Sequence, residues 1–81
     1  MGELVKYIAM NLVDKPEEVK VQVKEGENST IIELTVAPED MGKVIGKQGR
    51  IAKAIRAVVK AATAKYPKPV FVEIQKSAGS N

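Results

Sequence analysis

The first dozen residues carry apolar side chains at helical spacing. They fall on one face of a 3.6-residue repeat and are Leu4, Val5, Ile8, Ala9 and Leu12. The repeat stops near Asp14-Lys15-Pro16, because a proline ends a helix at or before the residue that precedes it. The pattern therefore predicts an amphipathic helix at the start of the chain.

The apolar positions then change to a period of two. The alternating residues are Val19, Val21, Val23, Ile32, Leu34 and Val36. The intervening segment Glu25–Ser29 contains the glycine, asparagine and serine that are typical of turns. These features predict a β-hairpin with one buried face.

A short helix, a long helix and a strand are predicted for the second half. The segment Ala37-Pro38-Glu39-Asp40 is typical of a helix start, with proline and acidic residues in the first turn. No helix breaker interrupts residues 50–65, and Tyr66-Pro67-Lys68-Pro69 closes that segment. Val70 to Gln75 alternates as a strand. We expect one domain over residues 1–76 and a flexible polar tail over residues 77–81.

The long helix has three chemically distinct faces. The apolar stripe expected to pack on the sheet is Ala52, Ile55, Val58, Val59, Ala62 and Tyr66. A cationic face carries Lys53, Arg56 and Lys60. A third face holds only small residues: Ala54, Ala57, Ala61 and Ala64. The alanines fit either an exposed surface rich in helix formers or a contact with another helix or subunit.

Composition excludes most enzymatic chemistry. The 81 residues include no cysteine and no histidine, which removes thiol nucleophiles, the usual zinc ligands and the commonest general base. We therefore expect no catalytic residues, no metal and no cofactor. Since the apolar N-terminal stretch is interrupted by polar residues, we also expect a soluble cytoplasmic protein that does not enter membranes.

Positive charge is concentrated in one part of the chain. Residues 1–38 contain four basic and seven acidic residues, a net charge of −3. Residues 39–66 contain seven basic and two acidic residues, a net charge of +5. The overall charge of +3 therefore hides a segregation that favours an anionic partner for residues 39–66.

The segment Ile45-Gly46-Lys47-Gln48-Gly49-Arg50 lies at the centre of this basic region. Two glycines before a helix permit unusual φ angles and close approach of a ligand to the main chain, and the helix N-terminus offers free N–H groups. Lys47 and Gln48 are expected to point outward, and Arg50 adds a guanidinium group. The segment predicts a clamp for phosphate groups, although glycine pairs at this spacing also occur in ordinary turns.

The order helix, strand, strand, short helix, glycine loop, long helix, strand resembles a type II KH domain. The residues that carry the resemblance are Gly42, Lys43, Val44, Ile45, Gly46, Lys47, Gln48, Gly49, Arg50, Ala52 and Ile55. A single domain of this size is similar to the bacterial KhpA family. The chain departs from the usual KH motif at Ala52, where a bulky aliphatic residue is more common.

The resemblance implies an α+β fold with helices on one face of a three-stranded sheet, and a groove for about four nucleotides. In that groove Gly46 and Gly49 shape the clamp, Lys47 and Gln48 meet the phosphates, and Ile45 and Ala52 lie near the bases. Charge and helical spacing add Lys43, Arg50, Lys53 and Arg56 as further candidates. The expected ligand is single-stranded RNA, with single-stranded DNA as the alternative.

The resemblance also implies partners and a cellular role. We expect a homodimer or a complex with a larger KhpB-type KH protein, and a role as an RNA chaperone or post-transcriptional regulator linked to cell shape and cell-wall homeostasis. The alternative is a protein-interaction or dimerisation module with little RNA affinity. The basic and neutral residues in the loop, Lys47 and Gln48, favour RNA binding over that alternative.

Overall fold

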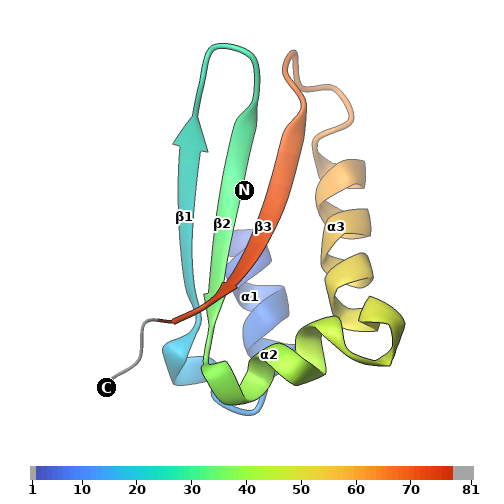
Figure 1. Cartoon of the computed structure of the whole chain (residues 1–81). Helices are drawn as coiled ribbons and strands as arrows, with labels where there is room; N and C mark the ends of the chain where they lie inside the picture. The colour runs from blue at the N-terminus through green and yellow to red at the C-terminus, as the bar shows by residue number, and fades with distance from the viewer. Residues whose placement is uncertain (1, 78–81) are drawn as a thin grey trace.

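The structure, a computed structural model, describes residues 2–77 (Figure 1). Its elements in chain order are α1 (Gly2–Leu12), a 3₁₀ turn η1 (Pro16–Glu18), β1 (Lys20–Glu25), β2 (Thr30–Val36), α2 (Pro38–Ile45), a 3₁₀ turn η2 (Lys47–Gly49), α3 (Arg50–Ala62) and β3 (Val70–Lys76). The expected α+β order is confirmed. Of the predicted tail, residues 78–81 lie outside the described residues.

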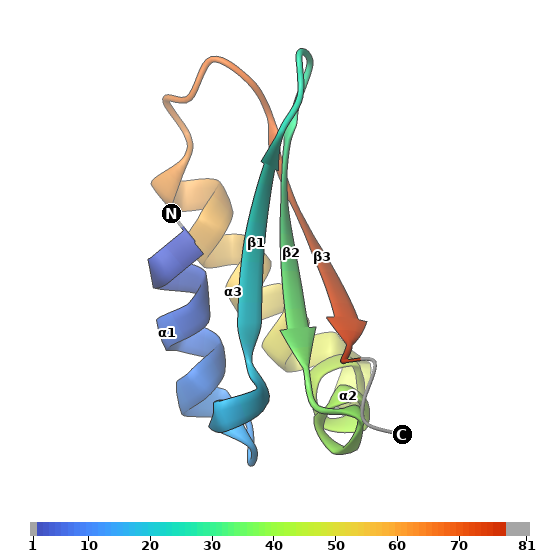
Figure 2. The same ribbon diagram turned by 90° about the vertical axis from the view of Figure 1, so that its left-hand side faces the viewer.

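The three strands form one sheet in the order β1-β2-β3. β1 and β2 pair as an antiparallel hairpin, and β3 pairs in parallel with β2, Ile32 lying opposite Val72. The parallel pairing requires a crossover connection, which α2 and α3 supply. α1 and α3 cover one face of the sheet, and α2 lies at the end of the sheet where β2 stops (Figures 1 and 2).

The core lies between the central strand and the two long helices. The residues predicted to face inward from β2, namely Ile32, Leu34 and Val36, are fully buried. Val5 and Ala9 of α1 pack against them, together with Ile55 and Val59 of α3. The opposite face of the sheet is open, and Phe71 is 54% exposed there, as its alternation with Val72 predicts.

The predicted apolar stripe of α3 is partly wrong. Ala52, Ile55 and Val59 are buried, whereas Ala62 is exposed, Val58 is 37% exposed and Tyr66 is 50% exposed. The helix ends at Ala62, so Tyr66 no longer follows the helical repeat. Val58 lies at the edge of the stripe, where a helix lying on a sheet is still open to solvent.

Candidate nucleic-acid interface

The glycine loop joins α2 to α3 through a short tight turn. The N–H group of Gly46 donates to the carbonyl of Gly42 over 2.7 Å and ends α2, and the N–H group of Gly49 donates to the carbonyl of Gly46 over 2.9 Å. Gln48 and Gly49 then adopt left-handed conformations, with φ angles of 64° and 69°. The chain therefore reverses within four residues and enters α3 directly.

The two glycines are needed for different reasons. Gly49 has the positive φ angle that the sequence predicts, but Gly46 has an ordinary φ of −76°. A Cβ atom at Gly46 would lie 2.2 Å from the carbonyl oxygen of Gly42, so no side chain fits there. Gly49 therefore uses the freedom in φ that glycine permits, whereas at Gly46 close packing against α2 is the constraint.

The N-terminus of α3 is left open for an anion. Its N-cap residue is Gly49, which has no side chain to accept hydrogen bonds from the first turn, and that turn contains no acidic residue. The first N–H groups of a helix lack partners within the helix and carry partial positive charge. Together with the left-handed turn at Gly49, they form a backbone site that suits a phosphate group.

The side chains around this turn are largely exposed. Gln48 and Arg50 are exposed, and Ile45 is 55% exposed beside them. The backbone of Lys47 belongs to η2, whereas its side chain lies outside the described part of the structure. An exposed aliphatic residue next to an exposed amide and a guanidinium group can contact both the bases and the phosphates of a nucleic acid.

A groove of about 430 Å³ runs between α3 and β3, and α3 is the helix that the glycine loop opens. Val59, Val70 and Val72 give it an apolar floor, and Arg56 and Lys60 line its helical side. The Nη2 atom of Arg56 lies 3.5 Å from the carbonyl oxygen of Val72, across the groove. An apolar floor with cations along one wall matches the needs of unstacked bases joined by phosphates.

The structure brings together some, but not all, of the candidate residues. Lys53 is exposed on the same side of α3 as Arg56. Lys43 is exposed on α2, and its Nζ atom lies 3.1 Å from the carboxylate of Asp14. Ala52 is only 3% exposed, within the core.

The position of Ala52 corrects the expectation that it lies near the bases. Its side chain belongs to the buried cluster that packs α3 on the sheet, because it lies one turn before Ile55 on the inward face. Val72 and Lys60 line the groove but were not among the residues predicted for it. Lys60 could have been identified from the sequence, because it belongs to the cationic face of α3. Val72 could not, because its place in the groove depends on the pairing of β3 at the edge of the sheet.

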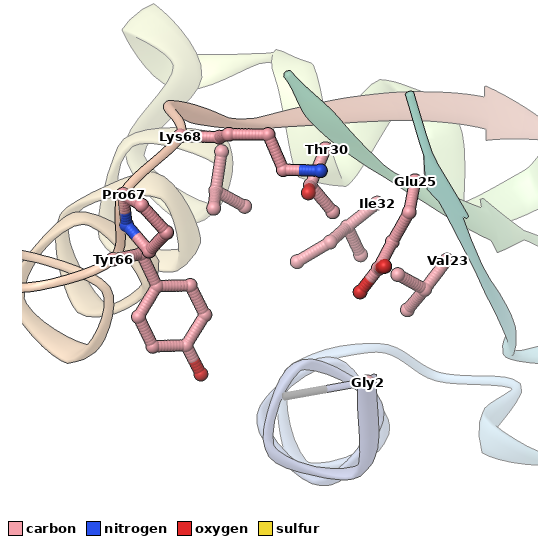
Figure 3. Close-up of a pocket in the computed structure, with 9 residues that line it drawn as sticks. Gly2, Val23, Glu25, Thr30, Ile32, Tyr66, Pro67 and Lys68 are labelled. Carbon is pink, nitrogen blue, oxygen red and sulfur yellow. The ribbon is translucent and has the colours of Figure 1, made fainter. Parts of the chain in front are cut away.

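A second hollow, of about 420 Å³, lies at the same end of the sheet and shares Val70 with the first. Figure 3 shows Tyr66, Pro67 and Lys68 on one side of it, with Val23, Glu25, Thr30 and Ile32 on the other, and Gly2 nearby. The Nζ atom of Lys68 donates to the carbonyl of Gly26 over 2.7 Å, so this cation is already engaged. With Glu25 on its rim, the second hollow lacks the cationic character of the first.

Two kinds of feature are absent from the part of the chain that the structure describes. Across residues 2–77, no helix is both long and apolar enough to cross a lipid bilayer. In the same part of the chain, no group of three or more aspartate, glutamate, histidine or cysteine residues is arranged to hold a metal ion.

A sheet of this topology, two helices on one face and a glycine loop that opens the second crossover helix together define a KH domain. A family model described as "KhpA/KhpB, KH domain" matches residues 2–74. The chain therefore belongs to the KhpA/KhpB family of KH domains, which is non-enzymatic.

Relatives of high identity extend over almost the full length. An RNA-binding protein KhpA from Clostridium perfringens is 69% identical over 74 residues, which are 91% of this chain and 99% of the relative. An RNA-binding protein KhpA from Caldanaerobacter subterraneus subsp. tengcongensis is 68% identical over 91% of this chain and 99% of the relative. Another, from Borreliella burgdorferi, is 53% identical over 89% of this chain and 88% of the relative.

Solved structures of Era share the fold. Era from Aquifex aeolicus bound to GDP and AlF4⁻ superposes with a TM-score of 0.59 at 22% identity, over 94% of this chain and 30% of the Era chain. Era in complex with MgGDPNP and nucleotides 1506–1542 of 16S ribosomal RNA gives a TM-score of 0.55 at 23% identity, over 93% and 29%. At this identity the likeness concerns the fold alone.

Proposed function

We propose that this protein binds single-stranded RNA, with the phosphate backbone on the loop Gly46–Gly49 and the bases in the groove between α3 and β3. The observations that carry the proposal are the open N-terminus of α3 and, along the C-terminal half of the same helix, a cation-lined groove with an apolar floor. The net charge of +5 over residues 39–66, from seven basic and two acidic residues, supports an anionic ligand. The KhpA relatives are named RNA-binding proteins, which agrees with this ligand.

Each part of the site has a separate role in this proposal. The N–H groups at the start of α3 donate hydrogen bonds to one phosphate, while Lys47, Gln48 and Arg50 contact the neighbouring phosphates. Ile45 contacts a base next to the loop, and Arg56 and Lys53 attract the backbone along α3. Because each contact is made to a phosphate or an apolar base face, one domain is expected to bind weakly with little sequence discrimination.

The test is fluorescence anisotropy of a short labelled single-stranded RNA, with wild type and a Lys47→Asp, Gln48→Asp variant at low and moderate salt. We expect salt-dependent binding by wild type and a loss of at least about tenfold in the variant, because negative charge replaces the phosphate contacts. Labelled DNA of the same sequence tests the choice between RNA and DNA.

The matched control is Gln22→Asp with Lys24→Asp, which makes the same two changes at exposed positions of β1. It alters the net charge by the same amount but leaves the loop intact. Equal losses of RNA affinity in the two variants would mean that only the total charge matters. Retained binding by the folded loop variant would contradict the assignment of the loop as a phosphate clamp.

Dimerisation is the second function that a specific observation favours. α1 and α3 contact each other on one face of the sheet. Leu4, Tyr7 and Met10 of α1 and Val58 of α3 are exposed, and so are the alanines of the third face of α3. We propose a homodimer through this helical surface, or a complex with a KhpB-type protein, which supplies avidity to two weak RNA sites. Light scattering of Ala57→Glu and Ala61→Glu variants should then report monomers, whereas unchanged dimers would exclude this face.

The cellular role follows from the same proposal. A weak, unselective RNA clamp in a dimer suits an RNA chaperone or post-transcriptional regulator in the cytoplasm, and we propose that this work is linked to cell shape and cell-wall homeostasis. Deletion of the gene, complemented by wild type or by the Lys47→Asp, Gln48→Asp variant, tests this role. Rescue of cell shape by the loop variant would separate that role from RNA binding.

A further inference from the structure

Asp40 is a buried carboxylate that the proposed RNA site does not use. Among the side chains that the structure describes, it is the only charged one in the interior, with 1% exposure. Its Oδ1 atom accepts a hydrogen bond from the N–H group of Asp14, and its Oδ2 atom accepts one from the N–H group of Lys15, each over 3.0 Å. Two backbone donors therefore compensate for the loss of water around this carboxylate.

These two hydrogen bonds join α2 to the segment that follows α1. Two exposed ion pairs connect the same segments, Lys15 with Glu39 over 3.3 Å and Lys43 with Asp14 over 3.1 Å. The contacts of Asp40 differ from these ion pairs because its carboxylate is buried and because its partners are main-chain N–H groups. A carboxylate bound to backbone N–H groups fixes the position of a segment more tightly than a pair of long exposed side chains.

Asp40 is also one of two anchors on the inward face of α2. The helix has eight residues, and Val44, one turn after Asp40, is the other fully buried side chain. Ile45 follows Val44, and the glycine loop begins at the next residue. Met41 also packs in part against the core. Loss of the two hydrogen bonds of Asp40 would therefore leave α2 without its buried link to residues 14 and 15, and we expect a shift of the helix that moves the start of the loop.

We propose that Asp40 is a positioning residue of the RNA clamp: by holding α2 against residues 14 and 15, it sets where the loop Gly46–Gly49 stands relative to the groove beside α3. This inference rests on the proposed RNA binding and adds a residue that contacts no RNA. Loosening α2 lowers the fraction of molecules with a correctly placed clamp, and the apparent affinity falls by the same factor.

The first experiment uses wild type alone and measures amide hydrogen exchange with and without single-stranded RNA. If the contacts of Asp40 favour the clamp that binds RNA, RNA must in turn favour those contacts, because coupling between sites is reciprocal. We expect slower exchange at the amides of Asp14 and Lys15 when RNA is bound, and unchanged exchange at Gly26 in the distant hairpin. Unchanged exchange at all three amides under saturating RNA would overturn the proposal.

The second experiment compares Asp40→Asn with Asp14→Asn. Both variants lose one negative charge, but Asp14→Asn removes only an exposed ion pair and keeps the N–H group that Asp40 binds. In Asp40→Asn an amide NH₂ group faces a backbone N–H donor, so one hydrogen bond is lost and two donors oppose each other. We expect RNA affinity to fall about tenfold in Asp40→Asn and to be unchanged in Asp14→Asn.

The outcomes separate this inference from the proposed function. If wild type binds no RNA, the proposed function fails. If wild type binds and folded Asp40→Asn binds equally well, only the positioning role fails, since a residue needed merely for stability would leave the affinity of the folded fraction unchanged. If Asp40→Asn does not fold, the exchange experiment on wild type decides whether Asp40 positions the clamp.

Discussion

The two glycine-containing turns of the molecule lie at opposite ends of it and have opposite chemistry (Figure 1). In the hairpin turn Glu25–Ser29, the N–H group of Gly26 donates to the carbonyl of Ser29 over 2.8 Å, and the carbonyl of Gly26 accepts from Lys68. In the loop Gly46–Gly49, the turn instead leads straight into α3, whose first N–H groups are free to bind an anion.

The two turns also differ in the charge of the residues around them. Glu25 and Glu27 surround Gly26, whereas Lys47 and Arg50 surround Gly49. Glycine therefore creates the turn in both places, but the helix that follows and the local charge decide which turn can hold a phosphate. Whether a glycine-containing turn can bind phosphate therefore depends on the element that follows it.

Among the glycine variants of these turns, Gly46→Ala is expected to have the largest effect on stability and RNA affinity. Its Cβ atom would lie 2.2 Å from the carbonyl of Gly42, so the backbone must move or α2 must lose its last turn. We expect unfolding in urea to show a loss of about 2 kcal/mol or more, and RNA affinity to fall with it. At Gly26 the nearest atom to a Cβ would be the carbonyl oxygen of Ser29 at 3.3 Å, so Gly26→Ala should cost much less and leave RNA binding unchanged. Equal effects at the two glycines would remove the distinction between the turns.

Gly49→Ala should have an intermediate effect. No atom lies within 4 Å of a Cβ at this position, so the cost is the strain of a φ of 69° for an alanine. That strain amounts to about 1–2 kcal/mol, and urea denaturation measures it. Gly49→Asn is the control, because asparagine tolerates left-handed conformations and should cost less. A larger loss for asparagine than for alanine would point to a requirement for space rather than for backbone conformation.

Gly42→Ala should instead stabilise the protein slightly. Gly42 lies within α2, and nothing lies within 4 Å of a Cβ there. Alanine in a helix interior is favoured over glycine by about 0.5–1 kcal/mol, which thermal melting would detect as a small rise in Tm. RNA affinity should not change. A loss of affinity in a stabilised Gly42→Ala protein would show that the RNA site extends back along α2.

The sequence predicts well those features that depend on neighbouring residues. The period of two from Thr30 to Val36 identifies the buried face of β2, and the run without breakers identifies α3 nearly to its end. The positive φ of Gly49 also follows from local chemistry. These properties are set by propensity and periodicity within a few residues, and a single sequence contains that information.

Features that depend on contacts between distant residues were missed. Asp40 reads as an acidic residue at a helix start, yet it is buried against main-chain N–H groups 25 and 26 residues away. The place of Val72 in the groove likewise depends on the pairing of β3 with β2, which brings the strand beside α3. Periodicity gives the face of a helix but not the partner opposite that face.

The smallest expected effect concerns the ion pair beside α2. A hydrogen bond from its own backbone N–H group and the nearby ammonium of Lys15 lower the pKa of Glu39 below its usual 4.5, and the same carboxylate raises the pKa of Lys15 above its usual 10.5. The stability from Glu39 is therefore complete above pH 4.5 and is lost as the pH falls through its lowered value, whereas that from Lys15 is complete below pH 10.5 and is lost at higher pH.

Both side chains are exposed, so Tm should change less between pH 7 and pH 3 in Glu39→Gln than in wild type, but only slightly. Glu33→Gln, which breaks the pair of the half-buried Glu33 with the exposed Lys24 on the hairpin, is the control of equal charge. A strong dependence of RNA affinity on Glu39 would mean that exposed charges, and not Asp40, hold α2 and its loop in place.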